Sequence, residues 1–227
     1  DIGSTLTVNR TVTLDLNGCV LKMTGSDSVI KVEADGDLTI QDRNTTTQHK
    51  FNPHCKYLTW YIDMWELDNG GSEIVSGGVI TGGGGDQSNG GGVLVAGGTL
   101  VMAGGSIVGC SAMSRGGGVC NNGTFIMSDG MIKGCTSPDG QYASGGGVRN
   151  SNQFTMTGGM IGDPDNENDA SHVYNTSSQE TTLTISGNAK IYTDITNVGI
   201  LNADGGEIAG TMTNDTNRYG NRVGGGD

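Results

Sequence analysis

The segment GTLVMAGGSIVGC, residues 98–110, is the most informative part of the chain, because the chain repeats it. It returns as GTFIMSDGMIKGC at 123–135 and, more loosely, as QFTMTGGMIG at 153–162. A period of 25–29 residues, built from short apolar strands and glycine turns, is typical of a solenoid. Each copy follows a Gly-Gly-Gly-Val run, and these runs begin at Gly90, Gly116 and Gly145.

Alternation inside each repeat predicts which side chains face the core. Successive side chains of a strand point to opposite faces, so each repeat supplies three inward positions. Three strands and three turns per repeat predict a three-sided coil, that is, an all-β parallel β-helix of about seven coils. The expected inward columns are Leu100, Phe125, Phe154 and Leu183; Met102, Met127, Met156 and Ile185; and Ile80, Ile107, Ile132, Ile161, Ile191 and Ile208.

Asparagine recurs at one position of the strand that precedes these columns. The apolar residue two positions earlier fixes its register, so each asparagine is expected to point inward. Stacked inward amides can hydrogen-bond along the solenoid axis and satisfy turn backbone groups. We therefore predict a structural ladder rather than a functional site for Asn121, Asn150, Asn175 and Asn197, with Asn214 in the same column.

One coil breaks the period. The strand around Leu38–Ile40 and the strand around Val79–Ile80 match neighbours in the repeat, where only a turn should separate them. We therefore predict a single β-helix domain over residues 1–227 with a loop insertion at about 43–73. The chain begins at Asp1 and ends in a coil without a polar cap, which predicts a piece of a longer chain or end-to-end self-association.

Composition narrows the partners. The net charge is −12, which disfavours nucleic acid and anionic membrane surfaces. No apolar run approaches about 18 residues, so no transmembrane segment is expected. Divalent cations and neutral glycans stay open as partners.

Three phrases carry a resemblance to a known family: DLNG at 15–18, GDLTI at 36–40, and the repeated Gly-Gly-Gly-Val unit. They resemble the right-handed parallel β-helix repeats of the pectin-lyase-like superfamily, in particular of adhesin-like bacterial surface proteins. The resemblance implies that the β-helix is right-handed and that the protein has an extracellular or cell-surface location. The superfamily includes polysaccharide lyases and glycoside hydrolases as well as non-catalytic adhesins, and no catalytic motif of its enzymes matches this sequence.

The insertion is the main candidate for ligand binding, because it carries five of the chain's eleven aromatic residues. Exposed aromatic rings stack on sugars, and a carboxylate can hydrogen-bond sugar hydroxyls. The alternative is that the rings form one face of an amphipathic helical element packed against the solenoid. The candidate ligand-binding residues are Tyr57, Trp60, Tyr61, Trp65 and Asp63.

An acidic turn is a second candidate site. Asp163, Asp165, Glu167 and Asp169 stand at alternate positions, where carboxylate oxygens suit calcium. The turn lacks the glycine and distal glutamate of a complete calcium loop, so a plain acidic turn is the alternative. No other cofactor is expected.

The cysteines allow two interpretations. Cys110 and Cys135 occupy one column on adjacent coils, about 4.8 Å apart, which is within disulfide reach. Two stacked, reduced side chains are the alternative. Cys120 is expected on the outer face, beside Leu94 and Arg149.

These observations favour a non-catalytic extracellular scaffold or adhesin segment that contacts a glycan or a partner surface protein through the insertion. A polysaccharide lyase or glycoside hydrolase is the competing hypothesis. Ice binding is a third, because the outward residues of the Leu-x-Met strands are rich in threonine and threonine arrays can organise water. Threonine is also a common exposed strand residue.

Overall fold

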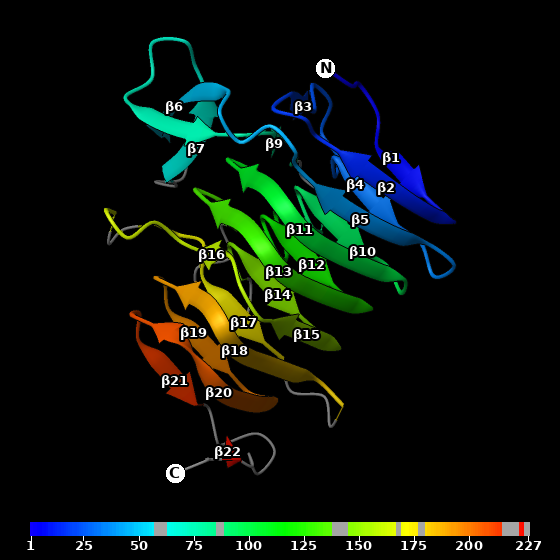
Figure 1. Cartoon of the computed structure of the whole chain (residues 1–227), viewed down its shortest axis with the longest axis vertical. Helices are drawn as coiled ribbons and strands as arrows, with labels where there is room; N and C mark the ends of the chain where they lie inside the picture. Colours follow the sequence, from blue (N-terminus) through cyan, green and yellow to red (C-terminus); the bar gives the residue numbers. More distant parts are fainter. Residues whose placement is uncertain are drawn as a thin grey trace.

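The computed structural model describes residues 1–56, 63–84, 89–137, 145–166, 169–176, 180–214 and 223–224. These residues form strands and turns without a helix, and the strands belong to three sheets. In the two large sheets the strands pair in parallel. The predicted all-β class is therefore confirmed, and the arrangement is solenoid-like, with successive strands stacked along the long axis from the amino end to the carboxyl end (Figure 1).

The first sheet has eight strands, each of three residues, stacked in the order β1-β4-β10-β12-β14-β17-β19-β21. Its pairing aligns Asn121, Asn150 and Asn175 in one column, as the repeat predicts. The strands are β1 (Leu6–Val8), β4 (Ile30–Val32), β10 (Val93–Val95), β12 (Val119–Asn121), β14 (Val148–Asn150), β17 (Val173–Asn175), β19 (Ile195–Asn197) and β21 (Met212–Asn214).

The second sheet has eleven strands, and its main path is β2-β5-β11-β13-β15-β18-β20-β22. These strands are β2 (Thr11–Asp15), β5 (Asp37–Gln41), β11 (Thr99–Val108), β13 (Thr124–Lys133), β15 (Gln153–Met156), β18 (Thr182–Ile191), β20 (Ile200–Ile208) and β22 (Val223–Gly224). Three short strands complete the sheet. Strands β9 (Val79–Thr81) and β16 (Met160–Ile161) pair with the far halves of longer strands, and β3 (Val20–Lys22) pairs with β9.

The long strands turn a corner in the middle. Strand β11 pairs with β5 up to Met102 and with β9 only from Ser106 onward. Gly105, between them, has a φ of +75°, and Gly130 on the next strand has a φ of +97°. Residues with a side chain rarely adopt a positive φ, so glycine is favoured at the point where the strand bends. Each repeat thus contributes three straight strand segments, two of them joined through a glycine corner.

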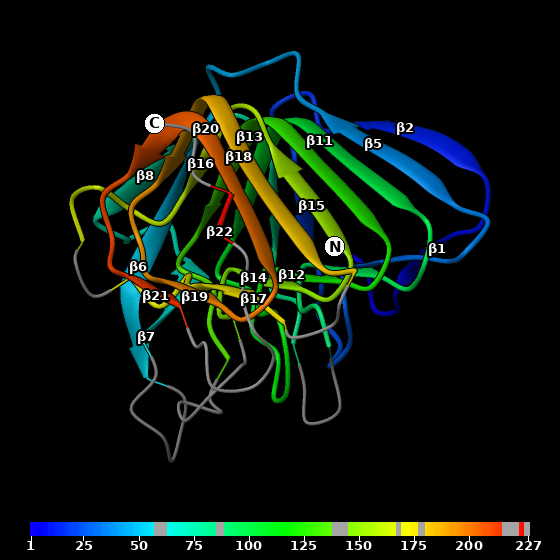
Figure 2. The same cartoon turned by 90° about the horizontal axis from the view of Figure 1, so that it is seen from below.

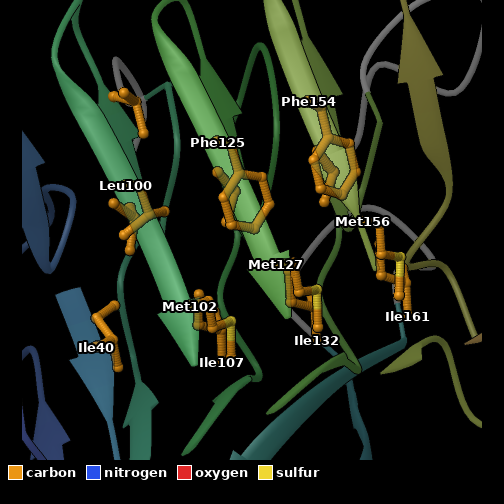
Figure 3. Packing of buried hydrophobic residues seen from close by; sticks show 14 of the residues in the cluster. Ile40, Leu100, Met102, Ile107, Phe125, Met127, Ile132, Phe154, Met156 and Ile161 are labelled. Carbon is orange, nitrogen blue, oxygen red and sulfur yellow. The ribbon is translucent and has the colours of Figure 1, made fainter. Parts of the chain in front are cut away.

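The core lies between the sheets and includes the predicted inward columns, together with the inward residues of the first sheet (Figure 3). The rings of Phe125 and Phe154 stack with centroids 4.5 Å apart and planes 7° from parallel. The columns are buried apart from Ile208, at the carboxyl end, which is partly buried. The alternation of the repeat therefore predicted the core correctly.

The third sheet lies between β5 and β9 in the sequence and outside the stack. It is antiparallel, in the order β7-β6-β8, and comprises β6 (Gln48–Lys56), β7 (Asp63–Leu67) and β8 (Glu73–Ser76). Viewed from the end of the stack, it stands at one corner, beyond the parallel strands (Figure 2). We call it the insertion sheet.

Candidate functional site

The insertion sheet is fixed to the solenoid by a second apolar cluster, separate from the main core. Phe51 of β6, Trp65 of β7 and Val75 of β8 form its outer side, and Val79 and Val108 of the solenoid form its inner side. All five side chains are at most 2% exposed. The rings of Phe51 and Trp65 lie 6.5 Å apart at their centroids. The whole side chains of Phe51 and Trp65 are thus buried where the insertion sheet packs against the solenoid.

Two glycines of the repeat make room for Trp65. Gly109 and Gly134 occupy the same place on neighbouring coils, with φ values of +61° and +60°. A Cβ on Gly109 would lie 1.8 Å from the carbonyl oxygen of Trp65, and one on Gly134 would lie 2.1 Å from its Cγ. The Trp65 backbone N–H also donates to the Gly134 carbonyl, at 3.4 Å. These two glycines therefore allow the insertion sheet to dock as well as the coil to turn.

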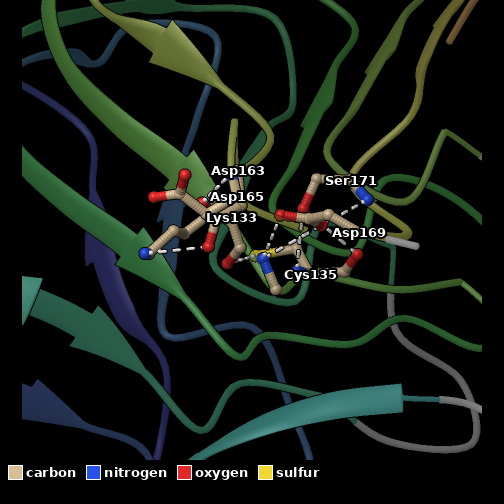
Figure 4. Close-up of polar contacts among 7 residues, drawn as sticks. Lys133, Cys135, Asp163, Asp165, Asp169 and Ser171 are labelled. Carbon is tan, nitrogen blue, oxygen red and sulfur yellow. Dashed lines mark hydrogen bonds and ion pairs between the residues drawn. The ribbon is translucent and has the colours of Figure 1, made fainter. Parts of the chain in front are cut away.

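A buried cation lies against the same ring. The Nζ of Lys133 lies 4.3 Å from the centroid of the Trp65 ring, and 3.3 Å from Oδ2 of Asp163 (Figure 4). The side chains of Lys133 and Asp163 are less than a tenth exposed. A cation against an aromatic face, paired with a carboxylate, is favourable when all three groups are desolvated together. The contact ties β7, β13 and the turn after β16 into one unit.

The burial of Trp65 corrects its predicted role. A ring that is 2% exposed cannot stack on a sugar, and it lies in a strand rather than on a helical face. Asp63 begins the same strand. Tyr57, Trp60 and Tyr61 lie outside the described residues, so the rest of that predicted ligand set stays a prediction.

The opposite face of the insertion sheet is open to solvent. Lys50 pairs with Ile74 across β6 and β8, and Asn52 pairs with Glu66 across β6 and β7. Lys50 and Glu66 are exposed, and Ile74 is 51% exposed. This face combines both charges, an amide and one large apolar side chain.

The acidic turn uses its carboxylates for internal contacts. Asp163 accepts from the backbone N–H of Asp165 at 3.1 Å, in addition to its ion pair with Lys133. Asp169 accepts from the N–H of Gly134 through both carboxylate oxygens, at 3.2 Å, and from the N–H of Ser171 at 2.9 Å (Figure 4). Burial raises the pKa of Asp169, opposed by its hydrogen bonds with Ser171 and Gly134.

The predicted calcium site gains no support from these contacts. Asp165 is exposed, and Glu167 lies outside the described residues. Among the side chains described, no group of three or more His, Cys, Asp or Glu residues is arranged to hold a metal ion. The contacts of Asp163 and Asp169 are those of the plain structural turn, the alternative interpretation of this segment.

The asparagine column forms a continuous amide chain. Nδ2 of each asparagine donates to Oδ1 of the next, at 2.7 Å between Asn121 and Asn150, between Asn150 and Asn175, and between Asn175 and Asn197. The last link, to Asn214, is 3.0 Å. The same Nδ2 groups also donate to backbone carbonyls of the next turn, as Asn150 does to Thr182. The chain is directional, since every donor points toward the carboxyl end.

Three of the cysteines lie inside or against the stack as free thiols. The sulfurs of Cys110 and Cys135 donate to backbone carbonyls, among them those of Ile80 and Ile107, and both side chains are fully buried. Burial, together with the neighbouring Cys110, raises the pKa of Cys135 well above its usual value. Cys120 does lie between Leu94 and Arg149 on the outer side, as predicted, but it is only 1% exposed.

The threonine-rich face forms two aligned columns that other residues interrupt. Thr99, Thr124, Gln153 and Thr182 make one column, and Val101, Ile126, Thr155 and Thr184 make the other. Most of these side chains are half-buried between their neighbours. Gln153, Val101 and Ile126 therefore stand in the same columns as the threonines.

Comparisons with known proteins give no match, whether with protein-family models, with curated protein sequences or with solved structures. In the part of the chain that the structure describes, no helix has the length and apolar character to cross a membrane.

Proposed function

We propose that the chain is a segment of a right-handed parallel β-helix of about seven coils, of the kind found in adhesin-like members of the pectin-lyase-like superfamily. Support comes from the three strand segments per repeat, the in-register parallel pairing and the inward amide chain. Each coil buries a thin apolar layer against the next, which suits a long rigid scaffold.

The proposed function is a non-catalytic scaffold that presents the insertion sheet to a glycan or to a partner surface protein outside the cell. One observation carries it: the insertion sheet is docked by a buried Trp and Phe, yet its other face is open. Because the insertion sheet is already held in place by its own apolar cluster, less conformational entropy is lost when it binds a ligand. The binding face would be Lys50, Asn52, Glu66 and Ile74, together with the aromatic residues between β6 and β7.

Binding to a glycan array tests this proposal. The full chain should bind a subset of glycans or a surface protein, and Trp60→Ala or the pair Lys50→Ala and Ile74→Ser should reduce the signal at least about fivefold. A matched control is Lys190→Ala, which removes one charge from an exposed ion pair on the solenoid. That control should leave binding unchanged.

Two other outcomes would replace the proposal. Release of reducing ends or unsaturated uronides from a polysaccharide would indicate a glycan-cleaving enzyme. Thermal hysteresis that is lost on replacing Thr155 and Thr184 would indicate ice binding through the threonine columns.

A further inference from the structure

The buried ion pair under the insertion sheet holds a primary amine against a carboxyl group. Nζ of Lys133 lies 3.3 Å from Oδ2 of Asp163, and the two side chains are only 9% and 7% exposed (Figure 4). The face of the Trp65 ring covers the amine, with Nζ 4.3 Å from the ring centroid. The ion pair of Lys190 and Glu207, in contrast, is about half exposed. Lys133 and Asp163 are therefore a reactive pair of groups held in contact and largely shielded from water.

The backbone holds the two groups together across neighbouring coils. Lys133 is the last residue of β13, and Asp163 follows β16, which pairs with β13 through Ile132 and Ile161. The N–H of Gly162, directly before Asp163, donates to the carbonyl of Ile132 at 2.9 Å. The amine and the carboxyl group therefore meet without movement of either segment. Fixing two groups in contact raises their effective concentration by several orders of magnitude over that of free groups in solution.

The surroundings of the pair favour attack of the amine on the carboxyl carbon. Burial disfavours charged groups, and transfer of one proton from Nζ to the carboxylate gives a neutral amine and a neutral carboxylic acid. The other oxygen of Asp163, Oδ1, accepts a hydrogen bond from the N–H of Asp165 at 3.1 Å. This N–H polarises the carboxyl group and stabilises the negative charge that develops on Oδ1 when nitrogen adds to the carbon. The pair thus has a nucleophile, an electrophile and a donor to the oxyanion.

We propose that Lys133 and Asp163 condense to an intramolecular isopeptide bond, with the ion pair as the state before condensation. The bond from Nζ to Cγ of Asp163 forms and the bond from Cγ to Oδ2 breaks. Oδ2 leaves as water with two protons from the ammonium group, so the step needs no oxidant, reductant or cofactor. Exclusion of water from the site protects the amide from hydrolysis. The bond joins two coils beneath the insertion sheet and does not depend on the function proposed for that sheet.

Mass spectrometry of the full chain, with its thiols reduced, tests the bond. The denatured chain should be lighter than its sequence by the mass of one water. Trypsin does not cleave after an acylated lysine, so the peptide 116–149 should appear joined to the peptide 150–190. Cleavage after Lys190, in the exposed ion pair, should be normal and serves as an internal control. A chain of full mass that trypsin cleaves after Lys133 would overturn the proposal.

Variants of the two residues assign the lost water to this pair. Lys133→Arg keeps a cation but removes the primary amine, and Asp163→Ala removes the carboxyl group, so both chains should have the full mass. The matched control Lys190→Arg, at the exposed ion pair, should still lack one water. Loss of water from Lys133→Arg, or from a single linear tryptic peptide of the original chain, would refute the bond. The joined peptides of the original chain decide the proposal even if a variant does not fold.

Discussion

The repeated stack and the insertion sheet are held together in different ways. In the stack, the surroundings of one residue are repeated on the next coil, as for the asparagines of β12, β14 and β17. In the insertion sheet every important contact occurs once: Phe51 on Trp65, Trp65 on Gly134, and Lys133 on the Trp65 ring. The stack therefore distributes its stability over many equivalent layers, whereas the docking of the insertion sheet is centred on one side chain, Trp65, within a single small cluster.

The largest expected effect follows from removing that side chain. Trp65→Ala should cost the docking of the insertion sheet about 3–5 kcal/mol, the range for truncating a buried Trp. Because the contact is local, amide hydrogen exchange should accelerate in β6, β7 and β8 and stay slow in β12 and β14. Hydrogen exchange read by mass spectrometry or NMR measures both.

The control for this substitution lies on the other face of the same sheet. Ile74 is 51% exposed, so Ile74→Ala should change the free energy of unfolding by no more than about 0.5 kcal/mol. Equal acceleration of exchange in the stack and in the insertion sheet after Trp65→Ala would show that the two regions unfold together. The insertion sheet would then not be stabilised separately from the stack.

A smaller effect is expected from breaking the amide chain in the stack. Asn150 is fully buried and hydrogen-bonds Asn121, Asn175 and the carbonyls of Asn152 and Thr182. Asn150→Ala leaves buried polar groups without partners and should lower the free energy of unfolding by about 2–3 kcal/mol in urea denaturation.

The matched variant for Asn150→Ala is a substitution of the asparagine at the end of the same column. Asn214, at the carboxyl end of the chain of amides, is only half-buried and accepts the last hydrogen bond. Asn214→Ala should therefore cost less than half as much as Asn150→Ala. If the two substitutions were equally destabilising, position in the stack would not set the value of a ladder residue.

The smallest expected change in stability concerns Asp169. Its carboxylate accepts a hydrogen bond from the N–H of Gly134, the glycine that lies against the Trp65 ring. Burial raises its pKa in the folded chain above the unfolded value, so between the two values the folded chain binds a proton that the unfolded chain does not. Stability from this group is therefore present at low pH and lost as pH rises through the folded pKa.

Comparison with Asp169→Asn isolates this contribution. From below pH 4 to pH 7, the free energy of unfolding of the original chain should fall relative to that of the variant. Urea denaturation of both proteins across that range measures the difference. A difference that grows in favour of the original chain as pH rises would contradict the direction of the pKa shift.

Prediction from the sequence succeeded where a residue's surroundings repeat. The columns of Leu100, Met102 and Ile107 were fixed by alternation and by the period, and the pairing in the structure follows them. It left two alternatives open where one contact spans the fold. Trp65 could be a sugar platform or could pack against the solenoid, and the structure buries it above Gly109 and Gly134, in a strand rather than on the expected helical face. The one sequence feature that indicated a separate apolar cluster in the insertion is its high content of aromatic residues.

Cys120 shows the same division at a single position. The period placed it on the outer face beside Leu94 and Arg149, which is correct. The structure leaves it only 1% exposed, and the alternation of a strand does not predict what covers an outward side chain.

The all-β class, the three-segment repeat, the inward columns and the alignment of the asparagines could be predicted from the residues alone, because each follows from a two-residue strand alternation and a period near 25 residues. The three-dimensional fold was needed to show how the insertion docks through Trp65 and how Lys133 pairs with Asp163. The physical reason is that these contacts join residues unrelated by the repeat, and their energies depend on burial and distances that periodicity does not encode.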